Sequence, residues 1–90
     1  MFLDTPYDMA LDAANRFRQM RLSKRVTIKE LSERSGVPNS TIRRFEHSGE
    51  IGFLALVKLA SALDEDEQIR ALFRDTVPGS IEEVIRANHR

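Results

Sequence analysis

The chain has 90 residues and carries 14 Lys or Arg against 14 Asp or Glu, so its formal net charge is zero. This length allows one small domain with a modest core, and the lack of cysteine excludes a disulfide framework or a thiolate metal site. The opening MFLDTPYD has no basic region before an apolar run, and no apolar stretch approaches the roughly 20 residues of a membrane span. We therefore expect a cytoplasmic protein that contacts no membrane.

A first helix is predicted to begin at Thr5 and Pro6, because threonine is a good N-cap and proline is tolerated at the first helical position. It should run to about Leu22. Its small and apolar residues recur at helical spacing, a stripe typical of core packing: Ala10, Ala13, Ala14, Phe17 and Met20.

Two short helices separated by a tight turn are predicted over residues 27–46, TIKELSERSGVPNSTIRRFE. Thr27 and Glu30 have the spacing of a capping box, so a helix should start there. Gly36 can close that helix in the left-handed conformation, and Val37 should plug the turn as an apolar residue.

The second helix of this pair has one apolar and one polar face. Ile42 and Phe45 recur three residues apart and should point inward. The polar residues leave a long outer face: Asn39, Ser40, Thr41, Arg43 and Arg44. Helix, glycine turn and polar second helix together match the motif whose second helix enters the major groove of DNA.

The charges are unevenly distributed along the chain. Residues 16–47 hold nine Lys or Arg against three Glu, a local charge of +6, whereas residues 48–85 hold three basic against eight acidic residues, a local charge of −5. The basic segment coincides with the two-helix motif, as a protein that neutralises phosphates requires. The alternative is an ordinary solvated charged surface.

Three further helices are expected downstream. Residues 53–63 are apolar on most sides, so this segment should be a buried central helix that packs on the apolar residues of the motif. A helix from about Glu65 to Arg74 carries apolar residues that either complete the core or form a dimer seam: Ile69, Leu72 and Phe73. Ser80 and Glu83 form a capping box before a short terminal helix, which docks on its own domain, on a dimer mate or on another protein.

From Phe17 to Leu63 the sequence resembles the helix-turn-helix of the Cro and lambda-repressor class, also called the Xre family. FRQMRLSKRVTIKELSERSGV leads into the turn, and RRFEHSGEIGFLALVKLASAL follows it. The resemblance implies an all-α fold, a five-helix lambda-repressor-like DNA-binding domain over residues 1–75, with a C-terminal extension over 76–90 that forms a short helix. It is closest to the branch that includes transcription regulators and antitoxins of toxin-antitoxin pairs.

The resemblance also assigns roles to individual residues. It implies DNA base contacts from Asn39, Ser40 and Arg44, and the chemistry agrees, since asparagine can bind adenine and arginine guanine in bidentate fashion. Phosphate contacts are implied for Thr41 and Arg43, and Thr27 at a helix start can offer its hydroxyl or backbone N–H to a phosphate. Two departures from the family pattern stand at helix starts, Ile28 and Pro38.

A structural ion pair between Arg21 and Glu46 is a further expectation from the resemblance, which places an arginine of the first helix against a glutamate near the end of the third. The alternatives for Arg21 are a phosphate contact or a solvated side chain.

Catalytic, cofactor-binding and metal-binding constellations are not expected. His47 and His89 are the only histidines and neither has companions for metal binding or catalysis. The acidic residues 64–67 fit a helix start favoured by the helix dipole. We therefore expect no enzyme and no cofactor.

The sequence as a whole indicates a DNA-binding transcriptional regulator, a repressor that inserts the helix around 38–47 into the major groove of double-stranded DNA. It should act as a homodimer on a palindromic operator, either alone or as an antitoxin that binds a cognate toxin and autoregulates their operon. The alternative is a protein-interaction module of the same fold that does not bind DNA.

Overall fold

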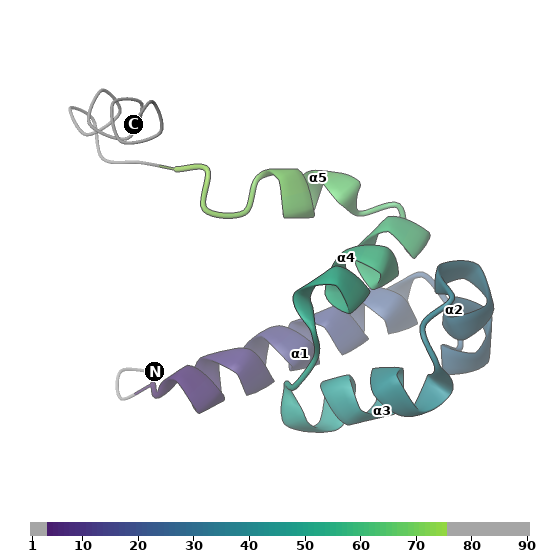
Figure 1. Ribbon diagram of the computed structural model, residues 1–90, viewed down its shortest axis with the longest axis horizontal. Helices are drawn as coiled ribbons and strands as arrows, with labels where there is room; N and C mark the ends of the chain where they lie inside the picture. The colour runs from purple at the N-terminus through teal and green to yellow at the C-terminus, as the bar shows by residue number, and fades with distance from the viewer. Residues whose placement is uncertain (1–3, 76–90) are drawn as a thin grey trace.

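The computed structural model describes residues 4–75, and all regular structure within this range is helical. The helices are α1 (Pro6–Ser23), α2 (Ile28–Ser35), α3 (Asn39–Ser48), α4 (Phe53–Ala62) and α5 (Asp66–Arg70) (Figure 1). The prediction of an all-α domain with five helices is confirmed. The predicted terminal helix and its capping box at Ser80 and Glu83 lie outside the described residues. Within the described range, no helix combines the length and apolar character of a membrane span.

The N-terminus of α1 is fixed by side chain to backbone hydrogen bonds. The hydroxyl of Thr5 accepts from the backbone N–H of Asp8 at 3.0 Å, and the Asp8 carboxylate accepts from the N–H of Thr5 at 3.2 Å. Pro6 follows at the first helical position, as predicted. Of the expected apolar stripe, Ala14 and Phe17 are buried, whereas Ala13 is exposed.

The turn between α2 and α3 has the predicted anatomy. Thr27 and Glu30 form a capping box at the start of α2, and Gly36 ends this helix with a left-handed φ of +78°. Val37 is buried in the turn. The hydroxyl of Ser32 donates to the Val37 carbonyl at 2.7 Å, which holds the turn against the helix that precedes it.

A single apolar core joins α1, α2, α3 and α4. Its buried residues are Ala14, Phe17, Val26, Leu31, Val37, Ile42, Phe45, Leu59 and Leu63. The rings of Phe17 and Phe45 meet edge to face, with centroids 5.3 Å apart and an interplanar angle of 63°. This contact packs α3 along α1, while α2 lies against both α3 and α4 (Figure 1).

The prediction that residues 53–63 form a helix buried on most sides is wrong. The helix itself forms, but α4 buries only Leu59 and Ala60, whereas Phe53 and Leu54 at its start are 59% and 68% exposed. The buried side faces α2, and none of the described elements covers the opposite side of the first turn. A helix with apolar residues on most sides can therefore remain partly exposed in a small domain.

The last predicted helix is also shorter than expected. α5 covers Asp66–Arg70 instead of about 65–74, and the chain then leaves helical geometry, with Phe73 at a φ of +58°. Ile69 is half-buried, but Leu72 and Phe73 are 42% and 90% exposed. Of the two roles proposed for these side chains, completion of the core is excluded for Leu72 and Phe73.

Lys24 joins the loop after α1 to the start of α5. Its Nζ donates to the carbonyl oxygen of Leu63 at 2.7 Å and lies 3.0 Å from the Glu65 carboxylate. Hydrogen bonds from Gln68 and Lys24 lower the pKa of Glu65 below the usual glutamate range. The Lys24 ammonium group is thus bound within the domain, although Lys24 belongs to the basic segment of the sequence.

Candidate nucleic-acid interface

The polar surface of α3 consists of two rows of side chains. Ile42 and Phe45 are buried beneath the helix, which leaves the opposite side to solvent. Residues four apart share one face of a helix, so the outer residues separate into one row of Asn39, Arg43 and His47, and another of Ser40, Arg44 and Ser48. The two adjacent arginines therefore belong to different rows and face different neighbours.

The row that contains Arg43 borders α1 and the start of α2. Arg43 and His47 line an open hollow together with Arg18 of α1 and Ile28 of α2. Arg18 and Arg43 are both exposed, so this hollow has cationic walls beside the N-terminus of α2. Positive side chains next to free backbone N–H groups at a helix start suit a phosphate oxygen.

The row that contains Arg44 borders the loop between α3 and α4. Nη2 of Arg44 lies 2.6 Å from Oε1 of Glu50, and the two side chains are 71% and 58% exposed. Arg44 is thus the one predicted base-contacting residue with an ionic partner in residues 4–75. Asn39 and Ser40 are both exposed on the first turn of α3.

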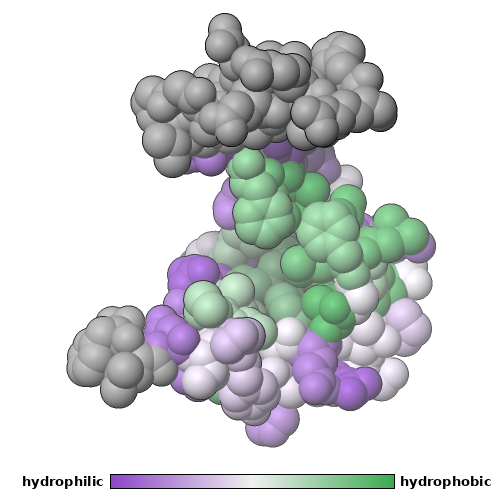
Figure 2. Space-filling model, turned by 60° about the vertical axis from the view of Figure 1, so that its left-hand side comes forward, coloured by the Kyte–Doolittle hydropathy of each residue, from purple (hydrophilic) through white to green (hydrophobic). Residues whose placement is uncertain are grey.

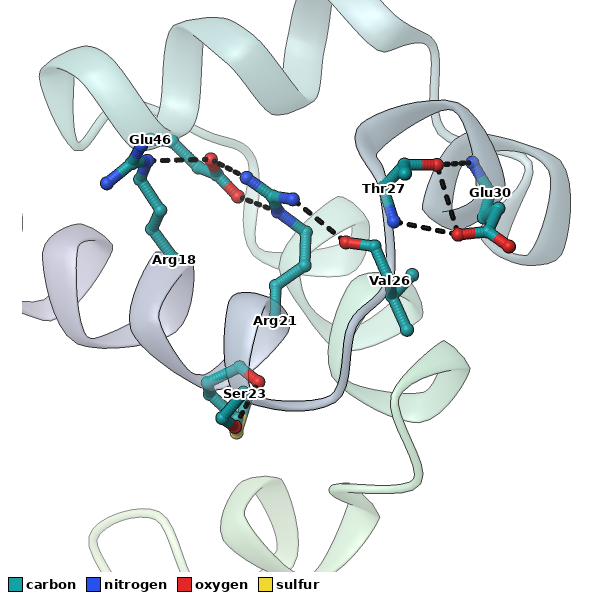
Figure 3. Close-up of polar contacts among 8 residues, drawn as sticks. Arg18, Arg21, Ser23, Val26, Thr27, Glu30 and Glu46 are labelled. Atoms are coloured by element: carbon teal, nitrogen blue, oxygen red, sulfur yellow. Dashed lines mark hydrogen bonds and ion pairs between the residues drawn. The ribbon is translucent and has the colours of Figure 1, made fainter.

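A buried ion pair lies beneath this surface. The guanidinium of Arg21 donates to both carboxylate oxygens of Glu46, from Nε at 2.7 Å and from Nη2 at 2.8 Å (Figure 3). Its Nη1 donates to the backbone carbonyl of Val26 at 2.9 Å. Arg18 approaches the same carboxylate, with Nε 3.8 Å from Oε1 of Glu46. The structure therefore brings Arg21 and Glu46 together and satisfies the arginine through three hydrogen bonds.

These contacts fix α3 relative to α1 at both ends of their interface. Toward the C-terminal end of α1, the fork between Arg21 and Glu46 holds the last turn of α3 against the last turn of α1. At the end of α3, Gly49 has a φ of +82° and lies so close to α1 that an added Cβ would stand 2.8 Å from the carbonyl carbon of Ala10. These core contacts consequently fix the orientation of the two polar rows of α3.

Thr27 is placed differently from what a phosphate contact requires. Its backbone N–H and its hydroxyl both donate to Oε1 of Glu30, at 2.9 Å and 3.1 Å. The hydrogen bonds from Thr27 stabilise the charged carboxylate and so lower the pKa of Glu30. The backbone N–H groups of Ile28 and Lys29 remain as the donors at this helix start, and Thr27 could reach a phosphate only if Glu30 moved aside.

The two departures from the family pattern have structural consequences. Ile28 is half-buried and packs against the core, so it contributes an apolar contact at the start of α2 and no polar group for a phosphate. Pro38 serves as the N-cap of α3 and makes no side-chain capping bond, and the helix begins at Asn39. Thr41 is half-buried in the first turn, with its N–H donated to the Pro38 carbonyl at 3.0 Å.

Two residues of this surface were not predicted from the sequence, Arg18 and Glu50. Arg18 precedes Arg21 by three residues, so helical spacing could have placed both near Glu46. Glu50 gives no such indication, because Gly49 ends the helix between Arg44 and Glu50 and local spacing does not carry across that break.

An outward polar helix that packs on α1 and α2, with a glycine turn before it, defines the class of helix-turn-helix proteins. Comparison with protein families agrees, since the helix-turn-helix family model matches residues 17–69. The chain belongs to this family, in its Xre and lambda-repressor type, and the match supports a DNA-binding regulator. The chain gave no match to curated proteins or to solved structures.

Proposed function

We propose that this protein is a sequence-specific transcriptional regulator, a repressor rather than an enzyme, that inserts α3 into the major groove of double-stranded DNA. The observation that carries the proposal is the outward polar face of α3, which the buried pair of Arg21 and Glu46 fixes on the scaffold. This face lies within the segment of local charge +6. Residues 1–75 are the DNA-binding domain in this proposal, and 76–90 are an extension that supplies partner contacts. A cytoplasmic location is part of the same proposal.

Roles on DNA follow from the two rows of α3. Asn39, Ser40 and Arg44 contact base edges, since they lie at the start of the helix or on the row away from α1. Arg43 contacts the phosphate backbone, because its row runs beside Arg18 and the α2 terminus. Thr41 and Thr27 are additional phosphate contacts. The contact from Thr27 requires that its hydrogen bonds to Glu30 break first.

Salt dependence of DNA binding tests the proposal. Duplexes are selected from a random-sequence pool with the full chain, and binding is then measured from low to high salt. Enrichment of one sequence and a steep decrease of affinity with salt are expected, because phosphate contacts release counterions. Failure to bind any duplex at low salt would refute a DNA-binding role.

Two arginine variants separate base from phosphate contacts. Arg44→Ala should cost about 1 to 3 kcal/mol on the selected duplex and relax preference at one base position. Arg43→Ala should weaken binding to all sequences alike and flatten the salt slope by about 1. Arg70→Ala on α5 is the matched control, because it removes the same charge from a helix that has no packing contact with α3. If Arg43→Ala and Arg70→Ala give the same slope, the phosphate role is wrong.

A homodimer on a palindromic operator completes the proposal, and the exposed apolar side chains of α4 and the segment after α5 support it. Figure 2 shows hydrophobic residues gathered on one face of the molecule. The large exposed side chains of α4 and this segment are Phe53, Leu54, Leu72 and Phe73. Exposed apolar surface of this kind commonly marks a protein interface, and a second copy would also place two α3 helices on one duplex.

Light scattering at increasing protein concentration tests this interface. Leu72→Ser and Phe73→Ser should each shift the protein toward monomer and weaken binding to the selected palindrome. Leu22→Ser is the matched control, since Leu22 is 44% exposed against 42% for Leu72 but belongs to α1. A dimer that is insensitive to Leu72→Ser and Phe73→Ser would exclude this face.

The second candidate function is a protein-interaction module, and the same exposed apolar residues favour it. In that case the face binds a different protein, such as a cognate toxin if the chain is an antitoxin. Co-expression with the product of the adjacent gene distinguishes the two: a complex that leaves DNA binding intact indicates an antitoxin, whereas a complex without any DNA binding indicates a pure interaction module.

A further inference from the structure

The loop that follows α3 carries a carboxylate at the edge of the proposed DNA surface. Glu50 lies beside Arg44, with 2.6 Å between Oε1 and Nη2. A negative charge at this place is unfavourable for general attraction to phosphates. Its position against the arginine proposed to contact a base therefore calls for a functional explanation, and the explanation that follows rests on the proposed function.

The backbone of this loop is held in place, so Glu50 occupies a defined position. The Gly49 N–H donates to the Phe45 carbonyl at 2.7 Å, and the close approach of Gly49 to α1 leaves no room for a side chain. The Ser48 hydroxyl donates to the Arg44 carbonyl at 2.7 Å and accepts from the N–H of Glu50 at 3.3 Å. Ser48 thus connects the backbones of the two residues whose side chains form the ion pair.

We infer that Glu50 is a specificity-determining residue that positions Arg44 for a base edge and discourages its contact with phosphates. A guanidinium has five N–H donors, so the donor bound by Glu50 leaves enough for a bidentate contact to guanine. Guanine presents neutral acceptors in the major groove, whereas a phosphate carries a full negative charge and is repelled by the nearby carboxylate. The Glu50 carboxylate therefore weakens the contact of Arg44 with a phosphate, which is independent of sequence, more than its contact with guanine, which is sequence-specific.

Glu50→Gln tests the inference, with the full chain measured on the selected duplex and on a scrambled duplex of equal length. The variant should bind the scrambled duplex about two- to fivefold more tightly, the range expected for one exposed charge interaction. Its salt slope on that duplex should steepen by about 0.9, the value for one additional phosphate contact. The ratio of specific to non-specific affinity should fall accordingly.

Three further variants make the outcome specific to the pair. Glu67→Gln makes the same charge change on α5, which has no packing contact with α3, and should leave the salt slope unchanged. Glu50→Asp keeps the charge and should keep the scrambled duplex weakly bound. In an Arg44→Ala background, Glu50→Gln should no longer change the affinity ratio.

The outcomes also separate this inference from the proposed function. If the unaltered protein selects no duplex, the proposed function fails. If it selects one but Glu50→Gln behaves like Glu67→Gln, or acts equally with and without Arg44, DNA binding stands and the role of Glu50 is refuted. Circular dichroism should give the same helix content for each variant, since Glu50 and Glu67 are both exposed.

Discussion

The ion pair of Arg21 and Glu46 should be costly to break from one side only. Their side chains are 6% and 5% exposed, so Glu46→Met leaves a guanidinium in the core without its counter-charge and beside a second arginine, Arg18. Loss of one partner of a buried pair costs about 3 to 5 kcal/mol. Small domains have about 5 to 15 kcal/mol of total stability. Glu46→Met should therefore remove a large share of the free energy of unfolding.

Arg21→Met and the double variant with methionine at both positions test whether the cost comes from the unpaired charge. Arg21→Met leaves Glu46 buried and also removes the donor to the Val26 carbonyl, and an unsatisfied buried acceptor adds about 1 to 3 kcal/mol. Replacing both charges by apolar residues of similar volume is often neutral or stabilising. We expect the double methionine variant to be more stable than Arg21→Met alone, although the Val26 carbonyl stays unpaired in both.

Urea unfolding followed by circular dichroism measures these free energies. Asp12→Asn is the control, because it breaks an exposed pair with Arg16 on the same helix, where the side chains are 69% and 65% exposed. Exposed pairs contribute about 0 to 1 kcal/mol. A loss from Glu46→Met no larger than that of the control, or losses of the two single variants that simply add, would show that the cost does not come from an unpaired buried charge.

Three other consequences of the structure can be measured directly. Gly49→Ala should destabilise the protein more than Gly36→Ala, by comparison of urea midpoints: both glycines have positive φ, but an added Cβ meets α1 at 2.8 Å only at Gly49 and finds open space at Gly36. Equal losses would show that only backbone strain matters. Glu30 and Glu65 titrate at lowered pKa, so each stabilises the fold above the pH range of an unfolded glutamate, and this contribution is lost as pH falls through the lowered folded value. Thr27→Ala should cost about 0.5 to 2 kcal/mol of folding free energy at neutral pH. It should also return the pKa of Glu30, measured by NMR, toward the usual glutamate range. An unchanged pKa would contradict the capping box.

Helix starts and ends were predictable because their causes lie within a few residues. Thr5 and Pro6 start α1, Thr27 and Glu30 start α2, and Gly36 ends α2. Each of these positions depends on a side chain bonding to backbone three residues away or on freedom at positive φ, and neither depends on the rest of the fold.

Burial was less predictable, and α4 shows why. A periodic apolar pattern identifies a helix, but an apolar residue is buried only if another element lies over it. Leu59 lies in the shared core, whereas Phe53 and Leu54 have no described element above them. The sequence cannot distinguish a residue that packs in its own core from one that a partner covers.

The candidate site likewise has some features that the sequence predicts and others that only the structure shows. Periodicity placed Arg43 and Arg44 on the polar face of α3, but only the structure shows that Arg43 borders Arg18 while Arg44 pairs with Glu50. For Thr27, the predicted capping box already implied that Glu30 accepts from the backbone N–H. The structure adds that the Thr27 hydroxyl donates to the same carboxylate, so neither donor is left for a phosphate.

What the sequence by itself determined is therefore the presence of five helices in residues 4–75, the capped starts of α1 and α2, the outward polar face of α3 and membership of the helix-turn-helix class. The partner of Arg21 came from family resemblance and not from spacing, since Glu46 lies 25 positions away along the chain. Only the tertiary structure decided which charge each arginine meets and which apolar side chains stay exposed. Capping and periodicity act over a single helical turn, whereas burial and ion pairing depend on how separate helices come together.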